Sequence, residues 1–400
     1  MSENHPVSDW DPTDSAVVAD YVGAFAELRS RCPVAWSDAW GGFWAVSSFD
    51  TVSQVCRDPK TFNNADQWSV PNLDLGVPWL PLQSDPPAHS RYRAVIAPYL
   101  VKSRVRTLEP ALRSIAQKLI VPLASRGTFD GAADFTQPFA GQALCIALNL
   151  PVDFWSRLYD WNRNIIRAFR TADGELLGSV LADISTYVAQ ESEARRADPG
   201  DDLMSALLRT DFDGRPLSPQ EMAGFYLLLM SAGHDTASNS LGHALVHLAE
   251  HPEHRARLRA EPELLPNAVE EIIRYYAPLL ALGRRSTEDV EVGGRQVRKG
   301  DQVALLWGPA SQDPERIADG SEFHLDRPLS KHLSFGLGTH YCVGAELGRL
   351  QLRIAIEEFL AAFDSFEVTG PTEKTSWPTN GYLKIPMTGR CVPSFSSASS

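Results

Sequence analysis

The chain has 400 residues, 44% of them hydrophobic, and a formal net charge of −13. This composition supplies a large buried core, while the acidic balance argues against non-specific nucleic-acid binding. Because no apolar run approaches the roughly 20 residues that cross a bilayer and the polar N-terminus lacks a signal peptide's apolar stretch, we expect a cytoplasmic protein without membrane insertion.

The first elements indicate a small β-rich lobe. Residues 41–46 are typical of a short strand, and residues 49–58 of a helix that Pro59 ends. From about Ala88 onward helical periodicity dominates, with strand-like pieces near 290–303 and 382–387. No repeat or shift in composition marks a boundary. We therefore expect one domain over residues 1–393 and a disordered Ser-rich tail at 394–400.

A long helix is predicted to begin at Ser218. Ser218, Pro219 and Glu221 form a capping box with proline at the first helical position. The helix can run to Glu250, which gives it 32 residues and a length of about 48 Å. Its centre, 231–236, reads Ser-Ala-Gly-His-Asp-Thr, a cluster of weak helix formers. Such a cluster fits either a packing face of small residues or a functional site.

Glu271 and Arg274 form an i,i+3 pair on a helix expected over residues 267–276. On an exposed helix the pair contributes only about 0.2–0.5 kcal/mol. The residues alone therefore leave a solvated surface pair as the simple alternative.

Cys342 lies in the run Phe-Gly-Leu-Gly-Thr-His-Tyr-Cys-Val-Gly at 335–344. Two glycines let the backbone turn tightly and approach a flat cofactor. A helix predicted from Val343 to about Phe363 places its N-terminus beside the sulfur, which favours the thiolate. The five cysteines are scattered without a Cys-x-x-Cys pair, so no zinc or iron–sulfur site is expected. A free cysteine is often only a small hydrophobe, but this spacing favours a metal ligand.

The pattern F-G-x-G-x-H-x-C-x-G resembles the haem-binding signature of the cytochrome P450 family. The resemblance extends over nearly the whole chain and implies a mainly α fold with a small β-rich lobe. In that fold haem b lies between the long central helix and the helix after the cysteine loop. The resemblance makes Cys342 the proximal ligand of the haem iron, with Phe335, Gly336 and Gly344 as cofactor-binding positions of the same loop.

The resemblance also assigns the centre of the long helix. Gly233, Asp235 and Thr236 match the family's oxygen-binding groove, in which the threonine hydrogen-bonds the bound dioxygen and the acid helps to relay protons. His234 occupies a variable position, and we expect it to face away from the iron.

Two further sets of residues match family positions. The first is a buried structural network, formed by Glu271 and Arg274 with Arg327 from the F-x-x-x-R segment at 323–327. The second would bind the haem propionates, because carboxylates withdrawn from water need cationic or hydrogen-bonding partners. Its members are His89, Arg93, Arg284 and His340.

The resemblance implies a haem-thiolate monooxygenase that inserts one oxygen atom of O2 into a small hydrophobic substrate, terpenoid-like or aromatic. Nothing in the sequence resembles a flavin or nicotinamide site, so the electrons should come from a separate ferredoxin or flavodoxin with its NAD(P)H-dependent reductase. We expect that partner to dock on cations of the thiolate side. The candidates are Arg91, Lys102, Arg104, Arg106, Arg113, Lys331, Arg349 and Arg353.

The substrate pocket is expected to be lined by residues 67–81, 227–232, 279–283 and 377–381. Two other functions stay open: oxidative coupling or peroxide-driven oxidation on the same scaffold, and a haem sensor without turnover. The Asp235–Thr236 pair argues against both. Arg285, which follows the predicted propionate ligand Arg284, has no assigned role. Residues 310–314 depart from the family's A-N-R-D-P pattern.

Overall fold

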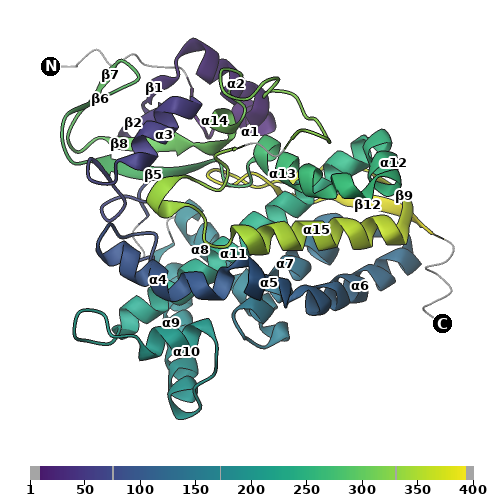
Figure 1. The fold of residues 1–400 in the computed structure, drawn as a ribbon, viewed down its shortest axis with the longest axis horizontal. Helices are drawn as coiled ribbons and strands as arrows, with labels where there is room; N and C mark the ends of the chain where they lie inside the picture. The colour runs from purple at the N-terminus through teal and green to yellow at the C-terminus, as the bar shows by residue number, and fades with distance from the viewer. Residues whose placement is uncertain (1–9, 74–75, 172, 329–330, 393–400) are drawn as a thin grey trace.

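The computed structural model describes residues 10–73, 76–171, 173–328 and 331–392. Helices dominate, and short strands gather mainly at one side of the molecule (Figure 1). The mainly α fold with a small β-rich lobe is thereby confirmed. The predicted Ser-rich tail at 394–400 lies outside the described residues, and the single-domain organisation stays a prediction.

The helices in this part of the chain are α1 (Ser15–Ala19), α2 (Tyr21–Arg31), α3 (Phe49–Arg57), α4 (Ala88–Leu100), α5 (Lys102–Arg106), α6 (Glu109–Arg126), α7 (Gln137–Ala147), α8 (Trp155–Thr171), α9 (Gly174–Ala197), α10 (Leu203–Arg209), α11 (Pro219–Glu250), α12 (Pro252–Ala260), α13 (Leu265–Tyr276), α14 (Trp307–Ser311) and α15 (Ala345–Ala362). The strands are β1 (Val34–Ser37), β2 (Phe43–Val46), β3 (Phe62–Asn63), β4 (Thr128–Asp130), β5 (Ala281–Ser286), β6 (Val290–Val292), β7 (Arg295–Val297), β8 (Gln302–Leu306), β9 (Phe363–Val368), β10 (Glu373–Lys374), β11 (Tyr382–Lys384) and β12 (Pro386–Cys391).

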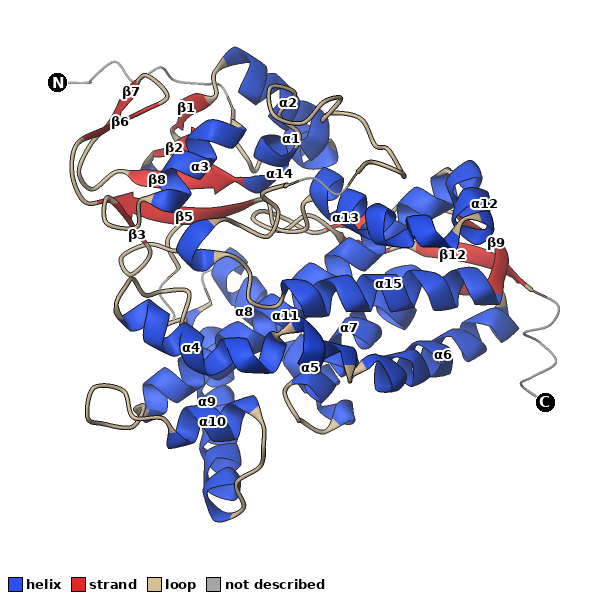
Figure 2. Ribbon diagram, viewed as in Figure 1, coloured by secondary structure: helices blue, strands red, loops and turns tan. Residues whose placement is uncertain are grey.

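The β-rich lobe is built on a five-stranded sheet with the order β1-β2-β8-β5-β3 (Figure 2). Strands β2 and β8 pair in parallel, and the other neighbours pair antiparallel. Successive side chains of β2 point to opposite faces, so Trp44 packs in one cluster with Val52 of α3 and Phe43 in another with Phe25 of α2. The predicted strand at 41–46 is buried on both faces for this reason.

The long central helix, α11, has the predicted bounds. The Ser218 hydroxyl accepts the Glu221 N–H at 3.2 Å, and the Glu221 carboxylate accepts the Ser218 N–H at 2.7 Å, which completes the capping box. Most of α11 is buried, and α7, α9 and α15 pack against it. Within the described ranges, no helix combines the length and apolar character that a bilayer crossing requires.

Candidate functional site

The cysteine loop approaches α15 through two left-handed glycines, Gly336 with φ 74° and Gly338 with φ 70°. The Cys342 N–H donates to the Phe335 carbonyl at 2.7 Å, which closes the loop. A Cβ on Gly338 would lie 2.8 Å from the Cys56 carbonyl oxygen of α3, so this position tolerates only glycine. The loop is therefore held between the β-rich lobe and the N-terminus of α15.

The Cys342 side chain is solvent-accessible although protein surrounds it. The surrounding protein desolvates the Cys342 thiol and so raises its pKa, whereas the Gly344 N–H and the cations Arg93 and Arg349 lower it. The thiol is thus presented to an open space with donors and cations that favour its anionic form.

A group of buried and partly buried basic side chains lies near the loop. The rings of His89 and His340 are 4.1 Å apart between centroids, and His89 Nδ1 and His340 Nε2 are buried without a hydrogen-bond partner. Burial and, to a lesser extent, the nearby arginines lower the pKa of His89 to about 4 and that of His340 to about 2. Burial also lowers the pKa of Arg93 and of Arg284. Among the described residues, neither arginine forms an ion pair with a carboxylate.

The centre of α11 is more exposed than the parts of the helix on either side of it. Ala232 is exposed, and Asp235 and Thr236 are partly exposed, whereas the helix on both sides is almost fully buried. The Thr236 hydroxyl donates to the Ala232 carbonyl one turn earlier, at 2.7 Å. Asp235 and Thr236 are thus available to a ligand beside α11.

Gly233 lies where α11 packs closely against α7. A Cβ at this position would lie 2.6 Å from Cδ1 of Leu144 in α7. The missing side chain therefore makes room for a neighbouring helix, and the part of Gly233 in the oxygen groove stays a prediction.

His234 is buried on the side of α11 that packs against α7. Its Nε2 lies 3.1 Å from the Gln137 carbonyl oxygen, and its Nδ1 lies 2.9 Å from Oδ1 of Asp235. Asn162 of α8 donates to the same carboxylate oxygen at 3.4 Å. Gln137 contacts His234, and Asn162 contacts Asp235, only through tertiary packing. No local pattern in the sequence therefore indicates either residue.

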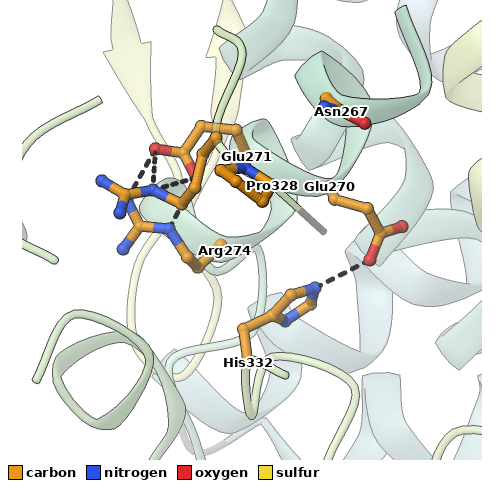
Figure 3. Close-up of a pocket in the computed structure, with 7 residues that line it drawn as sticks. Asn267, Glu270, Glu271, Arg274, Pro328 and His332 are labelled. Atoms are coloured by element: carbon orange, nitrogen blue, oxygen red, sulfur yellow. Dashed lines mark hydrogen bonds and ion pairs between the residues drawn. The ribbon is translucent and has the colours of Figure 1, made fainter. Parts of the chain in front are cut away.

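Figure 3 shows Glu271 beside Arg274 in the interior, and Arg327 completes the predicted network. The Arg274 guanidinium donates to both Glu271 oxygens at 2.6 and 2.7 Å, and Arg327 Nε lies 3.0 Å from Oε1. The two arginines also donate to main-chain carbonyls of residues 311–322. The side chains of Glu271 and Arg274 are only 2% and 1% exposed, which excludes the solvated-pair alternative.

Three of the expected pocket segments lie against one another. The Gly283 N–H donates to the Trp68 carbonyl, the Leu280 N–H to the Pro378 carbonyl, and the Trp377 indole to the Val70 carbonyl. Trp68 and Trp79 stack with centroids 4.4 Å apart, and both indole N–H groups are buried without a partner.

The segment 67–81 also approaches α11 closely. A Cβ on Gly224 of α11 would lie 1.8 Å from the Pro78 carbonyl oxygen. Arg285 donates to the Gln67 side chain at 2.7 Å, which ties strand β5 to the same segment and gives this arginine a structural contact.

A profile of the cytochrome P450 family matches residues 147–390, more than half of the chain. The chain belongs to the cytochrome P450 family. Linalool 8-monooxygenase of Pseudomonas putida is 31% identical to this P450 over 371 residues, which cover 88% of the chain and 90% of that protein. A methyl-branched lipid omega-hydroxylase of Mycobacterium bovis is 32% identical over 393 residues, which cover 92% and 90%.

Among solved structures, this P450 resembles Mycobacterium marinum cytochrome P450 CYP268A2 in complex with pseudoionone. The TM-score is 0.88 at 26% sequence identity, and the match covers 97% of this chain and 100% of that one. P450 proteins bind haem b, so this P450 is a haem-dependent oxidoreductase that uses O2 and a redox partner.

The residues present in this P450 fit a haem. The unpartnered donors of His89 and His340 and the unpaired guanidinium groups of Arg93 and Arg284 suit a buried group that carries two carboxylates. The accessible thiol of Cys342 supplies a soft ligand for iron.

Proposed function

We propose that this P450 is a monooxygenase that converts a C–H bond of a small hydrophobic substrate into C–OH. One atom of O2 enters the product, and the other leaves as water after two electrons and two protons are consumed. When bound, the haem supplies the metal at which O2 is activated. The observation that carries the proposal is the accessible Asp235–Thr236 pair at the centre of a buried helix.

The proposed roles of the protein's residues follow from what each side chain can donate or accept. Thr236 holds a hydroxyl proton at the reaction site, and Asp235 replaces it from a carboxyl group that His234 and Asn162 orient. Cys342 ligates the iron, and His89, Arg93, Arg284 and His340 bind the propionates. Phe335, Gly336 and Gly344 shape the cysteine loop, while Glu271, Arg274 and Arg327 hold the fold rather than take part in the chemistry.

We propose that the substrate is an apolar molecule of terpenoid-like size that carries a hydrogen-bond acceptor. Trp68 and Trp79 stack in the hydrophobic core within an expected pocket segment, and their unpartnered indole N–H groups require an acceptor. The names of two similar proteins agree with this class, because one is a linalool monooxygenase and one was solved with pseudoionone.

We propose that an acidic ferredoxin or flavodoxin docks on a smaller surface than the sequence suggests. Ion pairs neutralise five of the eight predicted cations, namely Arg91, Arg104, Arg113, Arg349 and Arg353. Lys102 and Arg106 on α5 and Lys331 before the cysteine loop are exposed, and within the described residues they have no such partner. Charge reversal at Lys102 and Arg106 should slow haem reduction at low salt without changing substrate affinity. An unchanged rate of haem reduction would refute docking at this surface.

The proposed activity is tested by an optical titration of the ferric protein with terpenes, aromatic acids, fatty acids and macrocycles, followed by turnover with 18O2. We expect a low-to-high-spin shift with terpenoid-like molecules and one labelled oxygen atom in the product. Product from peroxide alone, or coupled product without labelled oxygen, would favour the alternative chemistry. Absence of product under every condition would favour a sensor.

A further inference from the structure

Four of the ten histidines of the chain gather where α11 ends and α12 begins: His243, His247, His251 and His254. The ring centroids of His247 and His251 are 4.4 Å apart, and each of these rings lies 5.1 Å from that of His254. Like-charged imidazolium ions would repel one another at these distances. Uncharged imidazoles side by side are instead potential metal ligands.

Three side chains at this corner can bind one ion. His251, Glu253 and His254 each offer a ligand atom, and the three atoms all lie within 4.8 Å of one another. His251 Nδ1 and Glu253 Oε1 are already 2.9 Å apart. In the part of the chain that the structure describes, no other three His, Cys, Asp or Glu side chains meet this condition. Glu253 is exposed and the two histidines are partly exposed, so an ion can reach the site from solvent.

Buried partners orient one of these ligands from behind. His254 Nδ1 lies 2.9 Å from Nε2 of His247, whose own Nδ1 lies 2.8 Å from the Tyr276 hydroxyl. His247 is only 2% exposed and packs on Phe323 with ring centroids 3.9 Å apart. These contacts fix the ring of His254, and such outer partners usually accompany histidine ligands in metal sites.

The types of side chain in the cluster suit a metal. Neutral imidazole is the form that coordinates metals, and the carboxylate of Glu253 adds the negative charge that a divalent cation needs.

We propose that His251, Glu253 and His254 bind one divalent transition-metal ion of the Zn²⁺ class, with water completing the coordination. Imidazole with carboxylate suits Zn²⁺, Ni²⁺, Co²⁺ and Cu²⁺ better than Mg²⁺ or Ca²⁺. The site is not part of the haem chemistry, because Thr236 lies 15 residues before His251, about 22 Å along the axis of α11. The bound ion ties the end of α11 to the first turn of α12.

The test is a Zn²⁺ titration of the haem-loaded protein at pH 7.5 in competition with a zinc indicator, together with thermal unfolding. We expect one ion per chain, a dissociation constant in the micromolar range and a higher Tm with Zn²⁺ present. The double variant His251→Ala/His254→Ala should lose both effects. Glu253→Gln, at an exposed position, should weaken binding about tenfold or more.

His324→Ala is the matched control. His324 forms a partly exposed pair with Glu322 at 3.3 Å, and this pair belongs to no three-residue group. This variant should bind Zn²⁺ like the parent protein. Equal binding by the double variant would assign the ion to other groups such as cysteines and overturn the proposal, as would absence of binding by the parent.

Discussion

His234 Nδ1 and Asp235 Oδ1 lie 2.9 Å apart on consecutive residues of α11. The other ring nitrogen, Nε2, faces the Gln137 carbonyl oxygen, which can only accept a hydrogen bond, so Nε2 carries a hydrogen. The contact at Nδ1 therefore orients the Asp235 carboxyl group, which is the neighbour of Thr236 in the chain.

Replacing His234 should impair proton delivery without removing the cofactor. In His234→Phe we expect normal haem loading and substrate binding. The amount of product formed per O2 consumed should fall about tenfold, and the pH dependence of this yield should change. The lost hydrogen bond to the buried Gln137 carbonyl should also cost about 1–3 kcal/mol of stability. Asn162→Ala, which removes a longer contact of 3.4 Å, should have a smaller effect. Unchanged coupling and pH profile in His234→Phe would assign His234 to packing alone.

Thr236→Ala should keep haem and substrate binding but release most reducing equivalents as hydrogen peroxide, because the hydroxyl proton at the reaction site is lost. Ser240→Ala is its control. The Ser240 hydroxyl donates to the Thr236 carbonyl at 2.9 Å, the same type of bond one turn later in a buried part of α11. Product and peroxide are measured against NAD(P)H consumed. Full coupling in Thr236→Ala would refute the role of the hydroxyl.

Glu271→Gln should destabilise the protein by roughly 3–5 kcal/mol, since Arg274 and Arg327 would keep buried charges without their carboxylate. The expected signs are a large fall in Tm and a low yield of haem-loaded protein. Glu193→Gln is the comparison, because its pair with Arg196 is 76% and 53% exposed and exposed pairs contribute less than about 1 kcal/mol. A Glu271→Gln protein as stable as Glu193→Gln would contradict the structural role.

Acid should weaken the contact that Glu270 makes beneath the cysteine loop. Burial alone would raise the pKa of this carboxyl, but hydrogen bonds from His332 and Arg349 outweigh it and bring the pKa from 4.5 to about 2. The stabilisation is therefore complete above pH 4.5 and is lost as the pH falls towards 2, with an upper limit of about 3 kcal/mol. Urea unfolding between pH 6 and pH 3 should show a shallower fall of the unfolding free energy for Glu270→Gln than for the parent. Parallel curves for Glu270→Gln and the parent would contradict this role of Glu270.

Gly224→Ala should displace the 67–81 segment, since its Cβ cannot lie 1.8 Å from the Pro78 carbonyl oxygen. We expect weaker substrate binding, by about tenfold, with the haem still bound, because the loss of one well-packed contact costs about 1–2 kcal/mol. The spin-state titration measures the substrate affinity. Gly178→Ala in α9, where a Cβ meets no atom within 4 Å, should leave substrate affinity unchanged and raise stability slightly.

Local signals in the sequence predict the site's main elements well. The capping box locates the start of α11, and the spacing around Cys342 identifies the thiol loop, because both depend on neighbours in the chain. The sequence did not indicate the ion pairs of the predicted docking cations, since Arg113 and Arg353 reach carboxylates of helices that are distant in the chain. Gly233 is a similar case, because only packing places Leu144 against it.

The two guanidinium groups bound to Glu271 have a consequence for the chain that leads to Cys342. Between α14 and the cysteine loop the described residues form neither helix nor strand, so their carbonyls lack the donors that a neighbouring β-strand provides. Arg274 and Arg327 supply those donors to Ser311, Ala318, Asp319, Gly320 and Glu322. Side chains thus replace a missing sheet edge, and helix α13, through Glu271 and Arg274, helps to hold the chain that leads to Cys342.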